Sequence, residues 1–186
     1  MAEPTAEQVY AASELLVDRE RVTAHVDRWG VAVYAQLEAE ELSVIPLLTG
    51  GMIPAAWLAE RLPVPLQLDA MHLTRYRGGT RGGEIRFHAA PRRPVSGRTV
   101  LLVDDIFDEG YSLQAAAEWC REQGAGAVYT AVLTRKLHDR GLAREWPDFV
   151  AFDVPDRYVF GCGMDAFQHW RHLPEIRALT DELGAH

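Results

Sequence analysis

The chain has 186 residues, of which 48% are hydrophobic, and a formal net charge of −8. This length favours one domain with room for a small subdomain, and this composition supports a hydrophobic core. The acidic balance argues against a dedicated nucleic-acid-binding protein, which would normally carry a basic face. It leaves an anionic substrate open, because a metal ion can invert the local field of acidic residues.

Three features predict a cytoplasmic protein without a membrane anchor. The two cysteines, Cys120 and Cys162, have no paired spacing, so a reducing compartment is the default. The first ten residues are acidic rather than apolar, and we therefore expect no signal peptide. No run approaches the roughly 20 apolar residues of a membrane span.

Two helices are predicted at the start of the chain. Thr5 and Gln8 have the spacing of a capping box, and the apolar residues that follow predict a helix over 5–17. A second helix is expected to follow Asp18, with apolar residues at steps of three or four. We expect both helices to face the core and to carry no chemistry.

A strand, a glycine turn and a helix come next. Residues 43–48, SVIPLL, predict the strand, and Pro54 suits the first position of the helix. The turn between them contains Gly50 and Gly51. Adjacent glycines after a strand form either a plain turn or a backbone that approaches a phosphate closely.

A glycine-rich loop lies between two extended segments. Residues 66–76 and 84–88 predict strands, and residues 77–84 read RGGTRGGE. Four glycines in eight residues disfavour regular structure. The loop is either a hairpin connection or a lid that closes over a reaction and excludes water.

The stretch from Thr99 to Leu113, TVLLVDDIFDEGYSL, carries the strongest functional pattern. Four apolar residues predict a buried strand that ends at Asp104 and Asp105, and Gly110 predicts a tight turn into a helix. Open parallel sheets bind ligands at the carboxyl ends of their strands, and helix N-termini bind phosphate. The alternative is an acidic turn that only caps the helix.

The rest of the chain completes the alternation of strands and helices. A helix is predicted to end near Gly124, with one apolar face formed by Leu113, Ala116, Ala117 and Cys120. Residues 127–133 predict another buried strand. The pattern predicts an α/β fold with a doubly wound, mostly parallel sheet flanked by helices. Residues 149–154 and 158–164 predict short strands, and the tail from Trp170 is compatible with a short helix or 3₁₀ turn.

The acidic residues suit two kinds of chemistry at this edge. Asp104 and Asp105 can accept hydrogen bonds from ribose hydroxyls or hold Mg²⁺, directly or through water. Residues 108–112 can offer several backbone N–H groups and the hydroxyl of Ser112 to one phosphate.

Two segments resemble a known family. VLLVDDIFDEGYSL resembles the phosphoribosyl-pyrophosphate (PRPP) signature of type I phosphoribosyltransferases, with Glu109 where threonine is usual. Residues 147–165, PDFVAFDVPDRYVFGCGMD, resemble the matching segment of hypoxanthine-guanine phosphoribosyltransferases. Lys136 matches their purine-binding lysine, and Arg171 matches their late arginine. The resemblance covers about residues 43–176.

This resemblance implies a purine-salvage enzyme. The implied reaction transfers the 5-phosphoribosyl group from PRPP to N9 of hypoxanthine or guanine with Mg²⁺, giving IMP or GMP and pyrophosphate. The implied architecture is a single domain over 1–186, with a core at about 40–146. A hood over the base would combine N-terminal residues with about 147–186. A homodimer or homotetramer is implied as well.

The resemblance also implies a role for each matched position. Ribose and metal would be held by Asp104 and Asp105, and a second Mg²⁺ at the purine side by Asp165. Catalysis at purine N7 would fall to Asp108. The 5′-phosphate would be cradled by Asp108, Glu109, Gly110, Tyr111 and Ser112. The purine would be bound by Lys136 at O6, by the ring of Tyr158 and by the backbone of Val159. Pyrophosphate would be bound by Thr49, Gly50 and Arg171, and the lid would begin at Arg75 and Tyr76. Structural interpretations remain open for four of these positions: Lys136, Tyr158, Asp165 and Arg171.

Three positions depart from the family pattern. Thr49 precedes the glycine where lysine or arginine is usual, so pyrophosphate would depend more on backbone N–H groups. Arg75 stands where serine is usual and could meet the pyrophosphate directly. Glu109 adds a negative charge beside a phosphate site, which is unfavourable unless it points outward. The resemblance further implies a cis peptide bond between Thr49 and Gly50.

Two other functions remain open at this point. One is an enzyme of the same fold that acts on xanthine or another base, because Lys136 argues against adenine but does not separate xanthine from guanine. The other is a non-catalytic regulator that binds PRPP or nucleotides. The basic surface that such a regulator would need for nucleic acid is not evident at this net charge.

Overall fold

The structure, a computed structural model, describes residues 3–37, 41–76, 84–138 and 146–180. Its helices are α1 (Ala6–Ala11), α2 (Arg19–Gln36), α3 (Met52–Ala59) and α4 (Tyr111–Glu122). Its strands are β1 (Ser13–Val17), β2 (Leu42–Leu48), β3 (Leu66–Leu68), β4 (Met71–Tyr76), β5 (Glu84–Ala89), β6 (Thr99–Phe107), β7 (Ala127–Leu137), β8 (Phe149–Pro155), β9 (Val159–Phe160) and β10 (Ile176–Leu179).

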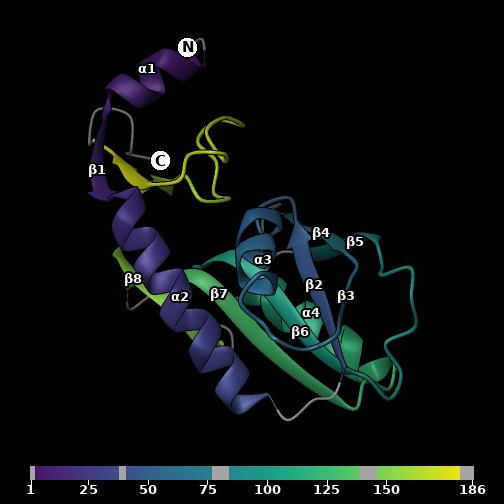
Figure 1. Ribbon diagram of the computed structural model, residues 1–186. Coiled ribbons are helices and arrows are strands. Elements are labelled where there is room, and N and C mark those ends of the chain that lie inside the picture. Colours follow the sequence, from purple (N-terminus) through teal and green to yellow (C-terminus); the bar gives the residue numbers. More distant parts are fainter. Residues whose placement is uncertain (1–2, 38–40, 77–83, 139–145, 181–186) are drawn as a thin grey trace.

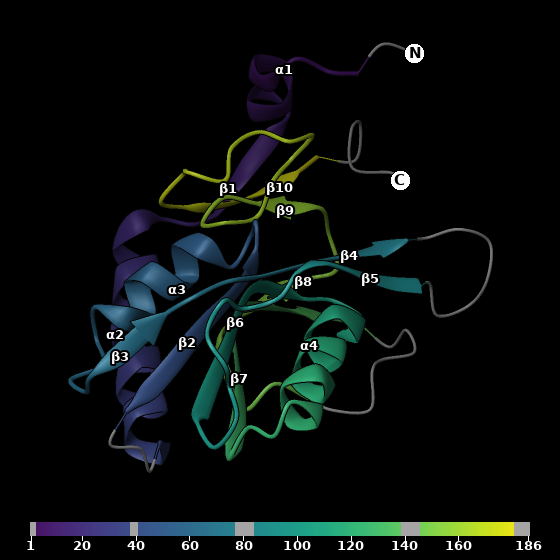
Figure 2. The same cartoon turned by 90° about the vertical axis from the view of Figure 1, so that its right-hand side faces the viewer.

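The predicted α/β fold is confirmed. The central sheet has the order β5-β4-β2-β6-β7-β8, and β3 also pairs with β2. All pairings among β4, β2, β6, β7 and β8 are parallel, whereas β5 runs antiparallel to β4. Figures 1 and 2 show three layers, with α2 and α3 on one face of the sheet and α4 on the other.

Alternation along the strands explains these layers. Leu101 and Val103 of β6 pack with buried residues of α2 and α3, whereas Val100 and Leu102 pack with buried residues of α4. Successive side chains of a strand point to opposite faces, so a continuous apolar run supplies two cores. Helices on both faces in turn require such runs, because a parallel sheet is buried on both sides.

The predicted helix starts hold in most places. Asp18 caps α2, because its Oδ1 accepts a hydrogen bond of 2.8 Å from the Arg21 N–H. The apolar face of α4 is buried as expected, and Gly124 adopts the left-handed conformation just after that helix. The helix α3 begins at Met52 rather than at Pro54, so the proline occupies its third position.

A second sheet of three strands joins the two ends of the chain and corrects two predictions. It has the order β1-β10-β9 and lies at one end of the central sheet (Figure 2). The predicted helix over 5–17 stops at Ala11, and the tail forms β10 instead of a helical turn. Antiparallel pairing of β1 with β10 outweighs the local helical pattern.

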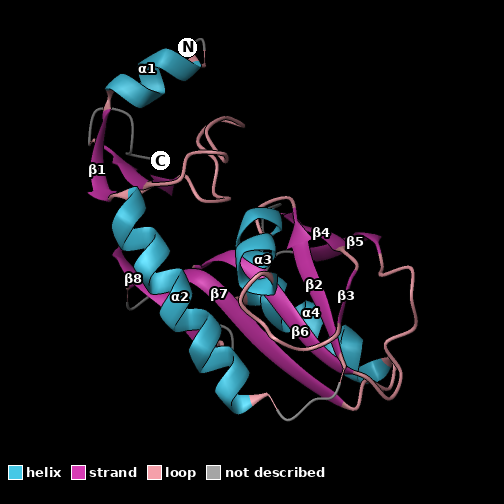
Figure 3. Ribbon diagram, viewed as in Figure 1, coloured by secondary structure: helices cyan, strands magenta, loops and turns pink. Residues whose placement is uncertain are grey.

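Residues after 147 divide between the two sheets. The segment Phe149–Pro155, assigned to the hood from the sequence, pairs in parallel with β7 as the outer strand of the central sheet. Of the residues 158–164, only Val159 and Phe160 form a strand, and the rest are turns and loop (Figure 3). In the part of the chain that the structure describes, no helix is long and apolar enough to cross a membrane.

Candidate active site

The acidic pair lies near the C-terminal end of the strand β6, which extends to Phe107. Asp105 is buried and its backbone N–H donates to Asp104 Oδ1 over 2.9 Å. The buried hydroxyl of Thr134 on β7 donates to the Asp105 carbonyl oxygen over 2.8 Å. Burial and the neighbouring charge of Asp105 raise the pKa of Asp104, and burial raises the pKa of Asp105. A bound cation or ribose hydroxyls would stabilise the charged forms.

The glycine turn after β2 packs directly against this pair. A Cβ on Gly50 would lie 1.9 Å from Asp105 Oδ2, and a Cβ on Gly163 would lie 2.3 Å from the Gly50 carbonyl oxygen. Only glycine fits at these two contacts. The predicted cis peptide bond occurs one bond earlier, at Leu48–Thr49 rather than Thr49–Gly50, where the strand gives way to the turn.

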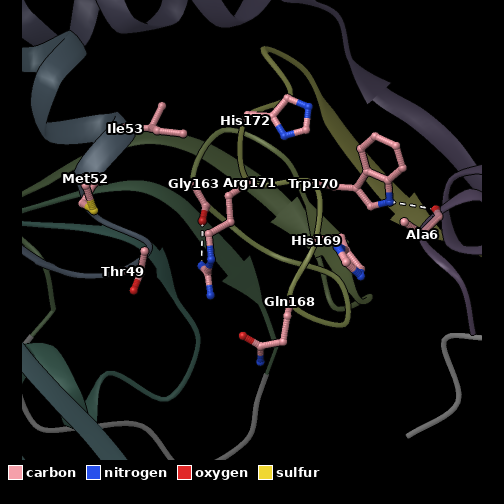
Figure 4. A pocket seen from close by; sticks show the side chains of 10 residues that line it. All are labelled: Ala6, Thr49, Met52, Ile53, Gly163, Gln168, His169, Trp170, Arg171 and His172. Atoms are coloured by element: carbon pink, nitrogen blue, oxygen red, sulfur yellow. Dashed lines mark hydrogen bonds between the residues drawn. The ribbon is translucent and has the colours of Figure 1, made fainter. Parts of the chain in front are cut away.

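Arg171 joins the C-terminal loop to the acidic pair. It donates to the Gly163 carbonyl oxygen over 2.8 Å and to Asp165 Oδ1 over 2.5 Å. Its Nη1 also lies 3.7 Å from Asp105 Oδ2. Arg171 and Thr49, both expected at a pyrophosphate, line one cavity of about 510 Å³ (Figure 4).

A second cavity, of about 320 Å³, lies at the N-terminus of α4. It is lined by Arg75 and residues 104–113. Gly110 precedes the helix with φ of +79° and provides no side chain to cap it. The backbone N–H groups of the first helical turn therefore have no capping side chain from that position, which favours an anion.

Asp108 meets two basic side chains from the end of β7. Lys136 Nζ lies 3.4 Å from Asp108 Oδ2, and His138 Nε2 lies 2.8 Å from Asp108 Oδ1. His138 is 3% exposed, and its Nδ1 is buried without a hydrogen-bond partner among the described residues. The sequence analysis did not identify His138 as a site residue, although it directly follows β7 and continues the alternation of Thr134 and Lys136, which share one face of that strand.

The remaining predicted purine residues lie in the loop around β9. Tyr158 is half-buried, and its ring is nearly parallel to that of Phe167, with centroids 6.0 Å apart. Burial, with a smaller contribution from Asp165, raises the pKa of Tyr158. Val159 is buried, and Asp165 accepts hydrogen bonds from Arg171 and from the Gln168 N–H.

The residues expected at the lid divide at the end of β4. Arg75 forms an ion pair with Glu109, and its guanidinium lies 4.4 Å from the centroid of the Tyr111 ring. The backbone of Tyr76 pairs with Glu84. Residues 77–83, the glycine-rich part of the predicted lid, lie outside the described residues.

The carboxylates permit a metal but do not enclose one. In residues 3–37, 41–76, 84–138 and 146–180, no three His, Cys, Asp or Glu side chains form a group that could hold an ion. Mg²⁺ is commonly held by one or two carboxylates together with substrate phosphates. Asp104 and Asp105 fit this arrangement because both offer oxygen ligands. A bound cation would also offset the free-energy cost of burying their negative charges.

The fold and this site define a phosphoribosyltransferase. A family model for the phosphoribosyl transferase domain matches residues 13–166. The hypoxanthine-guanine phosphoribosyltransferase of Streptococcus pneumoniae is 31% identical over 91% of this chain and 94% of its own, and that of Lactococcus lactis is 27% identical over 93% and 94%. A crystal structure of a Staphylococcus aureus hypoxanthine phosphoribosyltransferase matches with a TM-score of 0.84 at 25% identity, covering 91% of this chain and 92% of that one. The chain belongs to the hypoxanthine-guanine phosphoribosyltransferase family.

Proposed function

We propose that this protein transfers the 5-phosphoribosyl group of PRPP to N9 of hypoxanthine or guanine, giving IMP or GMP and pyrophosphate. The observation that carries the proposal is the position of Asp108. This carboxylate borders the cavity at the N-terminus of α4 and also contacts Lys136, the residue expected to select a 6-oxopurine. The proposed phosphate site and the lysine proposed to bind the purine therefore both lie beside one acidic residue.

The ribose would bind at Asp104 and Asp105. Their carboxylates can accept hydrogen bonds from the 2′ and 3′ hydroxyls, which helps to position C1′ for attack. Mg²⁺ bound there with PRPP would offset the charge of the pyrophosphate that leaves. Positioning and charge stabilisation suit a reaction whose transition state has oxocarbenium character at the ribose.

The 5′-phosphate would bind in the cavity at the N-terminus of α4. The residues from Asp108 to Ser112 line that space, their backbone N–H groups could donate to phosphate oxygens, and the helix dipole favours an anion. The members of this proposed cradle are Asp108, Glu109, Gly110, Tyr111 and Ser112.

The purine would bind between the ends of β7 and β9. Lys136 would donate to the exocyclic O6, and Asp108 would accept the hydrogen bond or proton of N7. Tyr158 would extend its aromatic stack with Phe167 to the base. The backbone of Val159 would contact the base edge, and Asp165 would complete this side, with an oxygen available to a second Mg²⁺.

Pyrophosphate would bind beside the turn after β2. Thr49 and Gly50 would offer backbone N–H groups, and Arg171 would supply the positive charge that the family usually places before the glycine. Arg171 already pairs with Asp165 and lies near Asp105, and these contacts hold its guanidinium in place. Pyrophosphate would therefore bind an arginine that is already positioned.

Location and assembly are further parts of the proposal. The cytoplasm suits a protein whose two cysteines are free, buried thiols. We propose a homodimer or homotetramer, which light scattering coupled to size-exclusion chromatography would distinguish from a monomer.

One assay tests the central proposal. The protein is incubated with PRPP and Mg²⁺ and with hypoxanthine, guanine, xanthine, adenine or uracil in turn, while pyrophosphate release is followed. Turnover with hypoxanthine or guanine is expected, and xanthine as the only substrate would favour the alternative base. Absence of turnover with any 6-oxopurine would overturn the proposal, and retained PRPP binding in that case would favour a regulator.

The role of Asp108 has its own test. Asp108→Asn should lower kcat by about 10²-fold, the scale of a positioned acid–base group, with a smaller change in the KM for PRPP. Full activity in this variant would remove Asp108 from the chemistry while leaving the substrate assignment intact.

A further inference from the structure

Two of the three departures from the family pattern touch each other. Arg75, near the end of β4, forms an ion pair with Glu109 in the turn before α4, 34 residues later. The strand β4 packs against α4 beside this turn (Figure 2). Arginine replaces the usual serine at one position, and glutamate replaces the usual threonine at the other. The positive charge at position 75 and the negative charge at position 109 therefore neutralise each other.

The pair also lies at the proposed 5′-phosphate site. Arg75 and Glu109 both line the cavity of about 320 Å³ at the N-terminus of α4. Among the described residues that line it, four are carboxylates and Arg75 is the one basic side chain. A phosphate dianion entering this cavity would meet Glu109 as an unbalanced negative charge if Arg75 were absent.

The guanidinium of Arg75 is held firmly rather than loosely exposed. Its side chain is 20% exposed, it lies 4.4 Å from the centroid of the Tyr111 ring, and Glu109 accepts its Nη1 hydrogen bond. Its Nε is buried and has no hydrogen-bond partner in the described part of the chain. Arginine donors in a fixed fork are well suited to phosphate oxygens.

We infer that Arg75 and Glu109 act as one unit that serves the 5′-phosphate, which rests on the proposed function. Glu109 and Tyr111 hold the guanidinium of Arg75 at the cavity, and Arg75 offsets the charge of Glu109 and binds the incoming phosphate. Arg75 is thus assigned to the 5′-phosphate rather than to the pyrophosphate, and Glu109 is a positioning residue.

Three variants test this unit: Arg75→Ser, Glu109→Thr and the double variant, which restores the family pattern at both positions. Arg75→Ser should raise the KM for PRPP by at least about 30-fold, because a cation is lost and a like charge is left beside the phosphate. Glu109→Thr should raise the KM for PRPP by about three- to tenfold, less than Arg75→Ser does, because Arg75 keeps its charge but loses the carboxylate that positions it. The double variant should recover at least about tenfold of the loss.

IMP separates the two phosphate sites. It carries the 5′-phosphate without a pyrophosphate, so its Kd should rise in Arg75→Ser by the same factor as the KM for PRPP. The KM for pyrophosphate in the reverse reaction should change by less than about threefold. Arg75→Lys should keep part of the affinity, because it keeps the charge without the planar fork.

Arg61→Ala is the matched control. Arg61 is 24% exposed and forms an ion pair with Asp27 at the far end of α3, so its loss should leave all of these constants unchanged. The inference is overturned if Arg75→Ser and the double variant are equally impaired, or if only pyrophosphate binding weakens. If the wild type is active and either of these two results is obtained, only this inference is refuted and the proposed function stands. A wild type that binds neither PRPP nor IMP would refute the proposed function as well.

Discussion

Gly50→Ala tests whether the turn after β2 and the acidic end of β6 must meet. A Cβ at this position would lie 1.9 Å from Asp105 Oδ2, 2.3 Å from Asp105 Cγ and 2.8 Å from Asp105 Oδ1. Ordinary contact begins at 3.4 Å, so the nearest pair falls about 1.5 Å short. The carboxylate cannot simply rotate away, because all three of its outer atoms crowd the new methyl group. Either the turn or Asp105 must move.

That movement should reduce catalysis more than folding. A displacement of about 1 Å in a positioned group can lower the rate by about 10²-fold, which corresponds to about 2.7 kcal/mol of transition-state stabilisation. We therefore expect kcat/KM for PRPP to fall by about 10²-fold. The added methyl group should also lower the free energy of unfolding, because overpacking of this kind costs about 1–3 kcal/mol.

Gly97→Ala is a control with the opposite signature. Gly97 has φ of +72° and nothing within 4 Å of an added Cβ, and it lies at the end of the sheet where β6 begins. Alanine there should lower stability by about 1 kcal/mol through backbone strain while leaving kcat/KM unchanged. Steady-state kinetics and thermal unfolding of both variants would separate the two effects. A Gly50→Ala protein with kcat/KM within about threefold of the wild type would refute the requirement for contact with Asp105.

Three further predictions follow from burial and charge. Burial raises the pKa of Asp104, so its charge should increasingly destabilise the free protein as the pH rises through that raised pKa. Asp104→Asn should therefore raise Tm by about 2–4 °C near pH 8, and by less at lower pH. The same variant should lower kcat/KM by at least about tenfold. Burial raises the pKa of the Cys120 thiol to about 11 and that of Cys162 to about 12, so a disulfide reagent near pH 8 should modify both at least about 100-fold faster after denaturation. Lys136→Gln should lower kcat/KM for hypoxanthine by about 10–100-fold through the loss of a charged hydrogen bond. The ratio of kcat/KM for hypoxanthine to that for adenine should also decrease.

Each of these has a contradicting outcome. An unchanged Tm for Asp104→Asn across the pH range would mean that the carboxylate is already stabilised in the free protein. Rapid labelling of either thiol in the folded protein would mean that the site of the cysteine opens readily. Arg135→Gln controls for Lys136→Gln, because Arg135 is the adjacent residue on the opposite face of β7 and pairs with Asp153; equal losses in the two variants would argue against base recognition by Lys136.

The centre of the fold could be predicted because its signals are local. The apolar run of β6 and the glycine at position 110 each determine a backbone conformation within a few residues. The helix α4 shows the same directness, since the residues predicted to form its apolar face are the buried ones. Alternating strands and helices then leave few topologies open, because parallel strands need crossover connections of one hand.

The two ends of the chain could not be predicted in the same way. Residues 13–17 continue the periodicity of α1, and the tail has apolar residues at steps of three, yet both segments form strands. Their partner is each other, about 160 residues away in the sequence, and Trp170 further ties the loop before β10 to α1 through a hydrogen bond to the Ala6 carbonyl oxygen. Strand formation depends on such a neighbour more than on intrinsic preference.

The site shows the same limit at the level of single residues. Glu109 has no favourable explanation in the sequence, because beside a phosphate it is only an added negative charge. Arg75 was expected from the sequence to meet the pyrophosphate, and nothing there linked it to Glu109. In the structure the two side chains form an ion pair, so the negative charge of Glu109 is balanced by Arg75. His138 is a similar case. Its position two residues after Lys136 predicts no role in the sequence, and only the structure shows that its Nε2 contacts Asp108. Departures from a family pattern are therefore best interpreted in pairs that touch, because selection acts on the summed charge of a site and not on each position separately.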